Sequence, residues 1–170
     1  EPTDIENTDC LVLIGSHLGE NMHNSQVQEF ARAIERRIPI IVVDPRFSVA
    51  ASKARHWLPI KPGTDLALLL AWMNVLVTEG LYDRAFVDKY GHGFDKFAAE
   101  IKQYTPEWAA IETGIDAALI RTTAREFARH RPATIIHPGR RVNWYGDDTQ
   151  RSRAIALLSA LLGNWGRKGG

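Results

Sequence analysis

Cysteine is almost absent from this sequence of 170 residues, which contains only Cys10. A single thiol cannot form an internal disulfide, a CxxC redox pair or a cysteine cluster for zinc or an iron–sulfur centre. None of the six histidines has the HExxH spacing of a zinc enzyme, and no Gly-x-Ser-x-Gly nucleophile motif occurs. The segment is therefore expected to hold no metal ligand and no catalytic residue, and Cys10 is expected to be buried.

Long hydrophobic runs and an excess of one charge are also missing. The longest apolar stretch, residues 66–77, is interrupted by Asn74 and is too short to span a membrane. Lysine plus arginine total 21 against 20 acidic residues, so a net charge of +1 gives no support for a general nucleic-acid binder. Apolar residues make up 45% and charged residues 24%, as in an ordinary globular domain. We expect no membrane insertion and no nucleic-acid partner.

Apolar runs typical of buried strands alternate with helical periodicities along the chain. The predicted strands cover 10–14, 40–43, 57–60 and 133–136, and the predicted helices cover 116–129, 147–162, a short stretch at 50–55, a segment from Thr64 to near Gly80, and a helix whose apolar face carries Val27, Phe30, Ala31 and Ile34. This order predicts an α/β fold, a three-layer αβα sandwich around a Rossmann-like, mostly parallel sheet. The aromatic-rich stretch 81–113 predicts a helical insertion packed on the sheet.

Glycine or polar residues directly follow each predicted strand. The segments concerned are 15–21, 44–48, 61–65 and 138–142. In an open parallel sheet, ligands bind beyond the carboxyl ends of the strands, which share one edge. The sequence therefore predicts a ligand site formed jointly by these four segments.

The first two segments each have two interpretations. Gly15, Ser16 and Gly19 before a helix suit a phosphate, but the pattern is neither G-x-G-x-x-G nor a Walker loop, and a simple turn is as good an account. Asp44 either accepts hydrogen bonds from ribose hydroxyls or starts a turn before Pro45. Arg46 either binds a phosphate or lies in solvent.

Asp65 opens the helix after the third predicted strand. An acid in the first turn complements the helix dipole, which is the more common role. Its two carboxylate oxygens could instead accept two adjacent N–H donors, which guanine offers on its Watson–Crick edge and adenine does not. Both interpretations remain open from the pattern.

Four stretches together resemble the molybdopterin oxidoreductases of the dimethyl sulfoxide reductase group. Residues 13–20 are similar to the Gly-x-Asn-x-x-Glu loop of that family, with His17 in place of its usual Asn, and residues 42–48 match Val-Asp-Pro-Arg-x-Ser/Thr. Residues 58–65 match Leu-Pro-Ile-x-Pro-Gly-Thr-Asp, and 161–170 match Leu-x-Gly-Asn-x-Gly-x-x-Gly-Gly. Residues 80–83 and 104–109 look most like the catalytic subunits of thiosulfate, polysulfide and tetrathionate reductases.

The resemblance implies that one arm of a molybdenum–bis(molybdopterin guanine dinucleotide) cofactor binds here. Carried over by position, the residues implied are Gly15, Ser16, His17, Glu20 and Asn21 for pyrophosphate and sugar, Asp44, Pro45, Arg46 and Ser48 for the nucleoside and its phosphate, Gly63, Thr64 and Asp65 for guanine, and Pro138, Gly139, Arg140 and Val142 near the pterin. The iron–sulfur cluster and the molybdenum ligand of the family lie outside this segment.

The resemblance further implies that residues 1–170 form one domain of a larger subunit, inactive by itself. Its partners would be the rest of that subunit together with iron–sulfur and membrane-anchor subunits, in the periplasm, and its substrate an inorganic sulfur compound, reduced or oxidised. Two other hypotheses stay beside this one. The chain could be a stand-alone nucleotide-binding module without redox activity, or a purely structural α/β domain.

Overall fold

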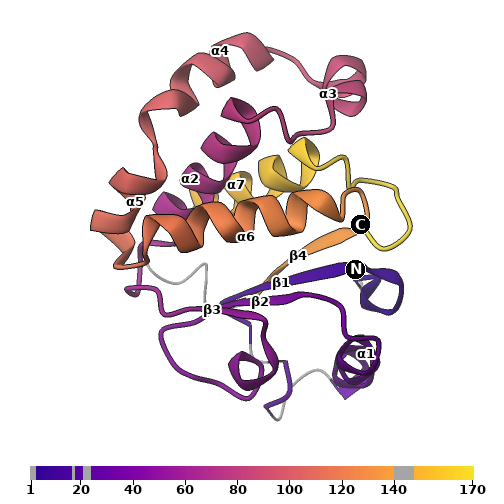
Figure 1. The fold of residues 1–170 in the computed structure, drawn as a ribbon. Helices are drawn as coiled ribbons and strands as arrows, with labels where there is room; N and C mark the ends of the chain where they lie inside the picture. Colours follow the sequence, from indigo (N-terminus) through magenta and orange to yellow (C-terminus); the bar gives the residue numbers. More distant parts are fainter. Residues whose placement is uncertain (1–2, 17, 21–23, 140–147) are drawn as a thin grey trace.

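The structure, a computed structural model, describes residues 3–16, 18–20, 24–139 and 148–170 (Figure 1). The strands are β1 (Cys10–Ile14), β2 (Ile40–Val43), β3 (His56–Leu58) and β4 (Thr134–Pro138). The helices are α1 (Asn24–Glu35), α2 (Asp65–Thr78), α3 (Arg84–Tyr90), α4 (Phe94–Glu100), α5 (Pro106–Thr113), α6 (Ala117–Arg129) and α7 (Asp148–Leu161). Three short 3-10 turns accompany them: η1 (Ile5–Asn7), η2 (Ala51–Lys53) and η3 (Ile101–Gln103).

The four described strands form one sheet in the order β3-β2-β1-β4, and every neighbouring pair is parallel. In the centre of the sheet, Leu13 of β1 pairs with Val42 of β2 on one side and with His137 of β4 on the other. The α/β prediction with a parallel sheet is therefore confirmed. The carboxyl ends of all these strands lie at the same edge of the sheet, hereafter the strand-end edge.

Helices cover both faces of the sheet, so the central strands are apolar along their whole length. Val12 and Ile14 belong to the larger apolar cluster with α2, α5, α6 and α7, while Leu11 and Leu13 belong to the smaller one with α1, η1 and η2. Figure 1 shows α1 below the sheet and α2, α6 and α7 above it. Cys10 is buried, as expected, and burial raises the pKa of its thiol.

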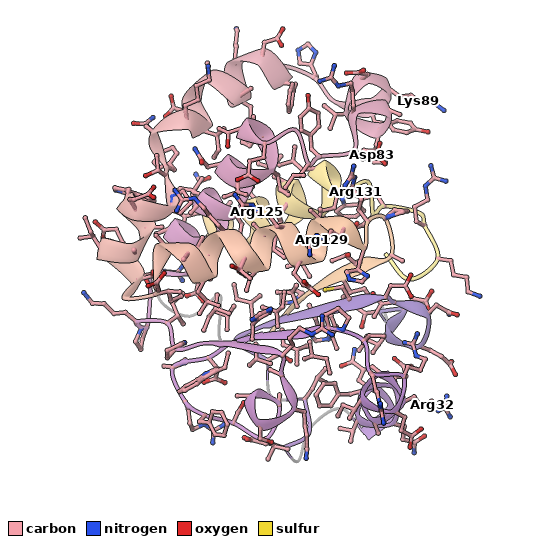
Figure 2. The ribbon with its side chains drawn as sticks, viewed as in Figure 1. Arg32, Asp83, Lys89, Arg125, Arg129 and Arg131 are labelled. Atoms are coloured by element: carbon pink, nitrogen blue, oxygen red, sulfur yellow. The ribbon has the colours of Figure 1, made fainter. Side chains whose placement is uncertain are left out.

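Helix α2 is the centre of the larger cluster. The indole Nε1 of the fully buried Trp72 donates to Thr123 Oγ1 of α6 at 3.0 Å, and its ring meets Phe127 edge-on at 5.2 Å. At the carboxyl end of α2, Arg125 of α6, which is labelled in Figure 2, makes a bidentate ion pair with Glu79, with both N–O distances 2.8 Å. These contacts fix α6 on α2.

The 81–113 segment is helical, as predicted, but its packing differs from the prediction. Its main contacts are with helices: α5 and η3 lie on α2, and α3 lies on α7, so the segment forms a further layer above the helices (Figure 1). Most of its aromatic rings are partly buried, whereas Tyr90 is 63% exposed. Side-chain caps begin two of its helices, Asp83 accepting from Phe86 N and Thr105 from Trp108 N.

Smaller differences from the prediction have local causes. Ala33 is buried on α1 whereas Ala31 is exposed, because the apolar stripe is centred one position away from the predicted one. The third strand covers 56–58 rather than 57–60, since Pro59 lacks the N–H that a longer parallel ladder needs. The predicted 50–55 helix is a single 3-10 turn.

Candidate functional site

Three backbone hydrogen bonds extend the sheet at the strand-end edge. Gly15 N donates to Val43 O at 3.2 Å, Asp44 N to Leu58 O at 3.2 Å, and Gly139 N to Ile14 O at 2.6 Å. Each bond ties the residue after one strand to the end of its neighbour. The structure therefore brings together at one edge the residues that follow β1, β2 and β4, and the turn after β3 begins at Lys61, three residues beyond Leu58.

The segments after β1 and β4 approach each other as closely as two backbones can. A Cβ built on Gly139 would lie 1.7 Å from the carbonyl oxygen of Gly15, which is far inside any permitted contact. Gly15 itself has φ +60°, in the left-handed region. Backbone rather than side chains therefore forms the floor of the edge here, and beside it Ser16 is buried at 5% exposure.

Asp44 has the turn role that the sequence left open. Its Oδ1 accepts from Arg46 N at 2.8 Å, closing a turn over Pro45, and its carbonyl accepts from Trp57 Nε1 at 2.9 Å. Ser48 also acts locally, since its Oγ accepts from Ala51 N at the start of η2. The ribose and phosphate roles of these residues stay predictions.

Glu20 links the segments after β1 and β2. Its Oε2 pairs with Arg46 Nη2 at 2.5 Å, and its Oε1 accepts from Val49 N at 2.9 Å. The hydrogen bond to Glu20 is the main reason that the pKa of Arg46 is raised. Arg46 nevertheless leaves 58% of its side chain exposed, so its guanidinium can also meet an incoming anion.

Replacing Glu20 should affect stability little. An exposed ion pair contributes roughly 0.2–1 kcal/mol, and water can replace the acceptor of the Val49 amide. Glu20→Ala is therefore expected to lower the free energy of unfolding by less than about 1 kcal/mol, and 1 M salt should reduce the difference by screening. Thermal denaturation of the purified protein measures both effects. A loss above about 3 kcal/mol would show that Glu20 is a core support of the fold.

Asp65 is buried at 7% exposure, at the first position of α2. Burial raises the pKa of its carboxyl group, and its own backbone amide and the positive charge of Arg151 partly oppose that rise. Thr64 occupies the N-cap position but makes no side-chain cap bond, because its Oγ1 donates to Lys61 O at 2.7 Å. An acid kept this far from water is unusual unless something uses its charge.

Arg151 is a residue of this edge that the motifs did not indicate. It is 3% exposed and its Nη2 donates to Gly63 O at 3.5 Å. One signal in the sequence could have revealed it: Arg151 stands four, seven and eleven residues before the apolar positions Ile155, Leu158 and Leu162, so it shares the buried face of α7. An arginine on such a face is rarely placed there for packing alone.

The remaining sequence-predicted residues are placed as follows. Pro138 ends β4 in an exposed position and Gly139 is buried. Gly63 and Thr64 are half-buried in the turn before α2, and Pro45 is exposed beside Arg46. Four of the predicted positions lie outside the described residues: His17, Asn21, Arg140 and Val142.

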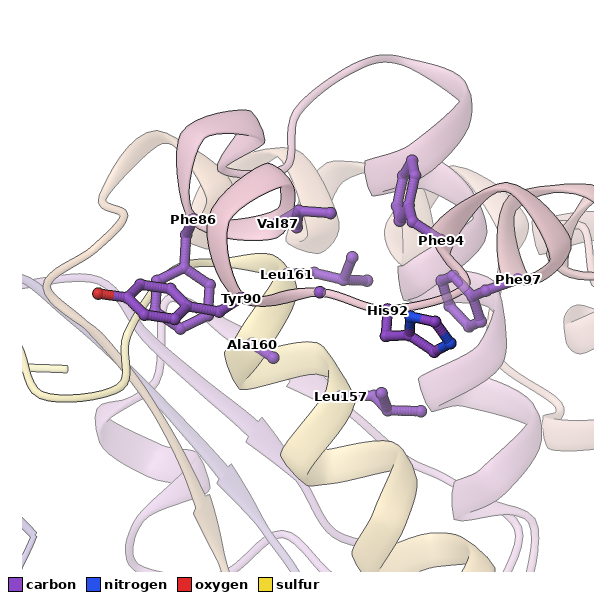
Figure 3. A pocket seen from close by; sticks show the side chains of 10 residues that line it. Phe86, Val87, Tyr90, His92, Phe94, Phe97, Leu157, Ala160 and Leu161 are labelled. Atoms are coloured by element: carbon purple, nitrogen blue, oxygen red, sulfur yellow. The ribbon is translucent and has the colours of Figure 1, made fainter.

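A separate hollow of about 300 Å³ lies in the helical layer (Figure 3). Phe86 and Tyr90 of α3 line one side and Phe94 and Phe97 of α4 the other, over Leu157 to Leu161 of α7. Since Asp83 N donates to Leu161 O and Asn164 Nδ2 to Thr134 O, this end of α7 lies toward the amino ends of the strands. The hollow is therefore distinct from the strand-end edge.

Among the described residues, no group of three or more His, Cys, Asp or Glu could hold a metal ion, and no helix is long and apolar enough to cross a membrane. The strand-end edge has groups that can bind a ligand. It offers a backbone floor without side chains, two buried carboxylates and two arginines, a combination suited to binding a polar ligand that carries anionic groups.

Comparisons with known proteins identify the family to which this chain is similar. The family model described as molybdopterin oxidoreductase matches residues 1–170. The chain is 40% identical over 167 residues to the thiosulfate reductase molybdopterin-containing subunit PhsA of Salmonella typhimurium, and 35% identical over 166 residues to the F420-dependent formate dehydrogenase subunit alpha of Methanocaldococcus jannaschii. These matches cover 98% of this chain, and 22% and 24% of those proteins.

A solved structure shows the same fold. The acetylene hydratase from Pelobacter acetylenicus matches with a TM-score of 0.86 and 32% identity, covering 95% of this chain and 22% of that one. The chain thus spans less than a quarter of the length of these relatives. The motifs at the strand-end edge, the matched family model and the shared fold agree, and the chain belongs to the molybdopterin oxidoreductase family.

Proposed function

We propose that residues 1–170 form a domain of a molybdenum oxidoreductase that binds one arm of a molybdenum–bis(molybdopterin guanine dinucleotide) cofactor. The observation that carries the proposal is the buried Asp65 at the same sheet edge as the Gly15–Gly139 floor and the exposed guanidinium of Arg46. A structural domain would gain nothing from a desolvated carboxylate there, because burial penalises its charge.

The residues at the edge fit the chemistry of such a ligand. Where Gly139 meets Gly15, no side chain stands between the backbone and a ligand. This lets a pyrophosphate approach the backbone closely, as glycine does at other sites where a ligand lies against the main chain. Arg46 would bind phosphate oxygens with one prong of its fork while Glu20 holds the guanidinium in place. Ser16 and Ser48 would contribute hydroxyl groups.

Asp65 would recognise the base. Its two oxygens can accept the adjacent N–H donors of guanine, and these charge-assisted bonds require the ionised carboxylate. Burial of the pair would strengthen each bond, since little water competes. Gly63 and Thr64 form the turn that sets the position of this carboxylate at the start of α2.

When bound, the cofactor supplies the molybdenum at which electrons are exchanged with the substrate. The residues of this chain bind and orient its nucleotide end, and the remainder of the subunit carries the metal ligand and an iron–sulfur cluster. By itself the domain is inactive. The substrate would be an inorganic sulfur compound, because the chain is 40% identical to a thiosulfate reductase subunit and residues 80–83 and 104–109 resemble that group of enzymes. This subunit would lie in the periplasm, and iron–sulfur and membrane-anchor subunits would complete the enzyme.

Acid extraction of the intact parent subunit tests the proposal. We expect guanine nucleotide to be released together with molybdenum and a pterin. Nucleotide without molybdenum or pterin would favour a nucleotide-binding module without redox activity. Absence of all three from protein produced with a molybdenum supply would leave only the structural hypothesis.

Asp65→Ala should lower the cofactor content of the intact subunit roughly 10- to 100-fold, because charge-assisted hydrogen bonds contribute about 1.5–3 kcal/mol each. The apo fold should persist: a carboxyl group whose pKa is raised on folding opposes folding at neutral pH, so its removal costs little. Molybdenum content and circular dichroism measure the two effects. Asp95→Ala, an exposed acid in the first turn of α4, is the matched control and should retain normal content.

A further inference from the structure

We propose that Arg151 is a positioning residue for the guanine-binding turn, holding the Gly63 carbonyl and acting as the counter-charge of the Asp65 carboxylate. The inference rests on the proposed function of Asp65 and adds a residue of α7 that no motif or comparison assigns. The proposed role of Arg151 is to keep the Asp65 carboxylate ionised and in position to bind guanine. Arg151 itself need not touch the cofactor.

The position of Arg151 supports the first part. It stands on the buried face of α7 near the start of that helix, and α7 packs along α2. Its Nη2 reaches the carbonyl oxygen of Gly63 at 3.5 Å, two residues before Asp65. This contact joins α7 to the turn between β3 and α2. A shift of α7 would therefore move the residues that place the carboxylate.

The burial of both charges supports the second part. A guanidinium stays protonated under all ordinary conditions, so at 3% exposure it needs nearby negative charge. Asp65, at 7% exposure, is one such charge, since the positive charge of Arg151 acts to lower the pKa of its carboxyl group. Arg153, two residues along the same helix, is exposed and donates to Gln150 Oε1 instead. Only one of these two neighbouring arginines is thus directed into the protein.

Other charged groups near α2 do not replace Arg151. Lys61 is exposed, and the ion pairs Arg121–Glu107 and Arg125–Glu79 satisfy charges of α5 and α6, the second at the far end of α2. Of the other charged side chains that the structure describes on η3, α5, α6 and α7, Glu126 is paired with Arg55, and the rest are exposed: Lys102, Glu112, Arg129 and Arg153. Among the described residues, Arg151 is the charged group whose field lowers the pKa of Asp65.

Removal of Arg151 should change the pKa of Asp65 in a definite direction. Burial raises the pKa of Asp65 and Arg151 opposes that rise, so without the guanidinium the pKa goes higher. Guanine needs the ionised form, and its retention is lost as pH falls through the pKa of Asp65. Loss of Arg151 should therefore move this acid limit of retention to higher pH.

The experiment uses the intact holo subunit with Arg151→Met, Arg151→Gln and the control Arg153→Met. Guanine nucleotide retained after gel filtration is measured between pH 4 and 8. We expect the midpoint of loss to rise by about one pH unit, a tenfold change in proton affinity, in both Arg151 variants and not in the control. Arg151→Gln keeps a donor for the Gly63 carbonyl and removes only the charge, so it carries the test if the methionine variant does not fold.

Infrared titration of ¹³C-labelled aspartate in the apo subunit, with Asp65→Asn identifying the band, follows Asp65 without any bound nucleotide. A band that titrates at the same pH in wild type and Arg151→Gln would overturn the inference, while Asp65→Ala could still lose cofactor and leave the proposed function standing. A shifted band with nucleotide retention unaffected by Asp65→Ala would instead overturn the guanine role, and the inference with it. A loss midpoint that moves equally in Arg153→Met would also overturn the role of Arg151.

Discussion

A methyl group added at Gly139 is expected to empty the subunit of cofactor. The new Cβ would lie 1.7 Å from Gly15 O, and no rotamer or flexible side chain can relieve a clash between two backbones. The β4 segment must move away from β1, which breaks the 2.6 Å bond from Gly139 N to Ile14 O and opens the floor of the strand-end edge. Because small displacements in a ligand site reduce affinity steeply, we expect at least roughly a 100-fold loss of retained molybdenum.

Metal analysis of the purified Gly139→Ala subunit, together with hydrogen exchange at the ends of β1 and β4, measures both effects. Gly80→Ala is the control, since Gly80 has φ +66° but open space around its Cβ position. It should cost about 1 kcal/mol of backbone strain and leave cofactor content unchanged. Normal molybdenum content in Gly139→Ala would mean that the ligand does not use this floor.

Trp72→Ala should destabilise the domain more than the truncation of any other buried side chain of α2. The substitution removes a fully buried indole, the hydrogen bond from its Nε1 to Thr123 and the edge-on contact with Phe127. Large-to-small substitutions of buried aromatic residues cost about 3–5 kcal/mol, because the cavity left behind collapses only partly. Thr123 would also lose its indole donor, although its hydroxyl still donates within α6.

The matched control is Trp165→Ala, the same chemical change at a side chain that is 58% exposed. Its expected cost is within about 0.5 kcal/mol, as for most surface substitutions. Opening free energies of the α2 amides, obtained from hydrogen exchange in the intact subunit, compare the two variants. Similar values for both would contradict the central position assigned to Trp72.

The central sheet could be predicted from sequence because its two inner strands are continuous apolar runs. Residues 10–14 and 40–43 have no plausible state other than a strand buried on both faces. The bounds of edge strand β3 are harder to predict, because two of its three residues are only partly buried and its apolar pattern is weak. The sequence predicts that 81–113 is helical, but the prediction that it packs on the sheet is wrong. An apolar helix face indicates that the face is buried and does not identify the element that covers it.

The candidate site could be predicted in part for the same physical reason. Parallel strands send all their carboxyl ends to one edge, so residues that follow strands had to meet. The link from Glu20 to Arg46 and Val49 depends on side-chain reach between loops 26 and 29 residues apart, which no local pattern records. Arg151 was missed because charge is normally expected on the outer face of a helix.

The separation of the two apolar clusters from the strand-end edge has a consequence for the order of folding and cofactor binding. Among the residues that the structure describes, neither cluster contains a proposed cofactor-binding side chain, so the described hydrophobic core is formed without them. A polypeptide of this design can reach its native state before its prosthetic group is inserted. Side-chain lesions at that edge should then accumulate as folded apoprotein rather than as substrates for proteolysis.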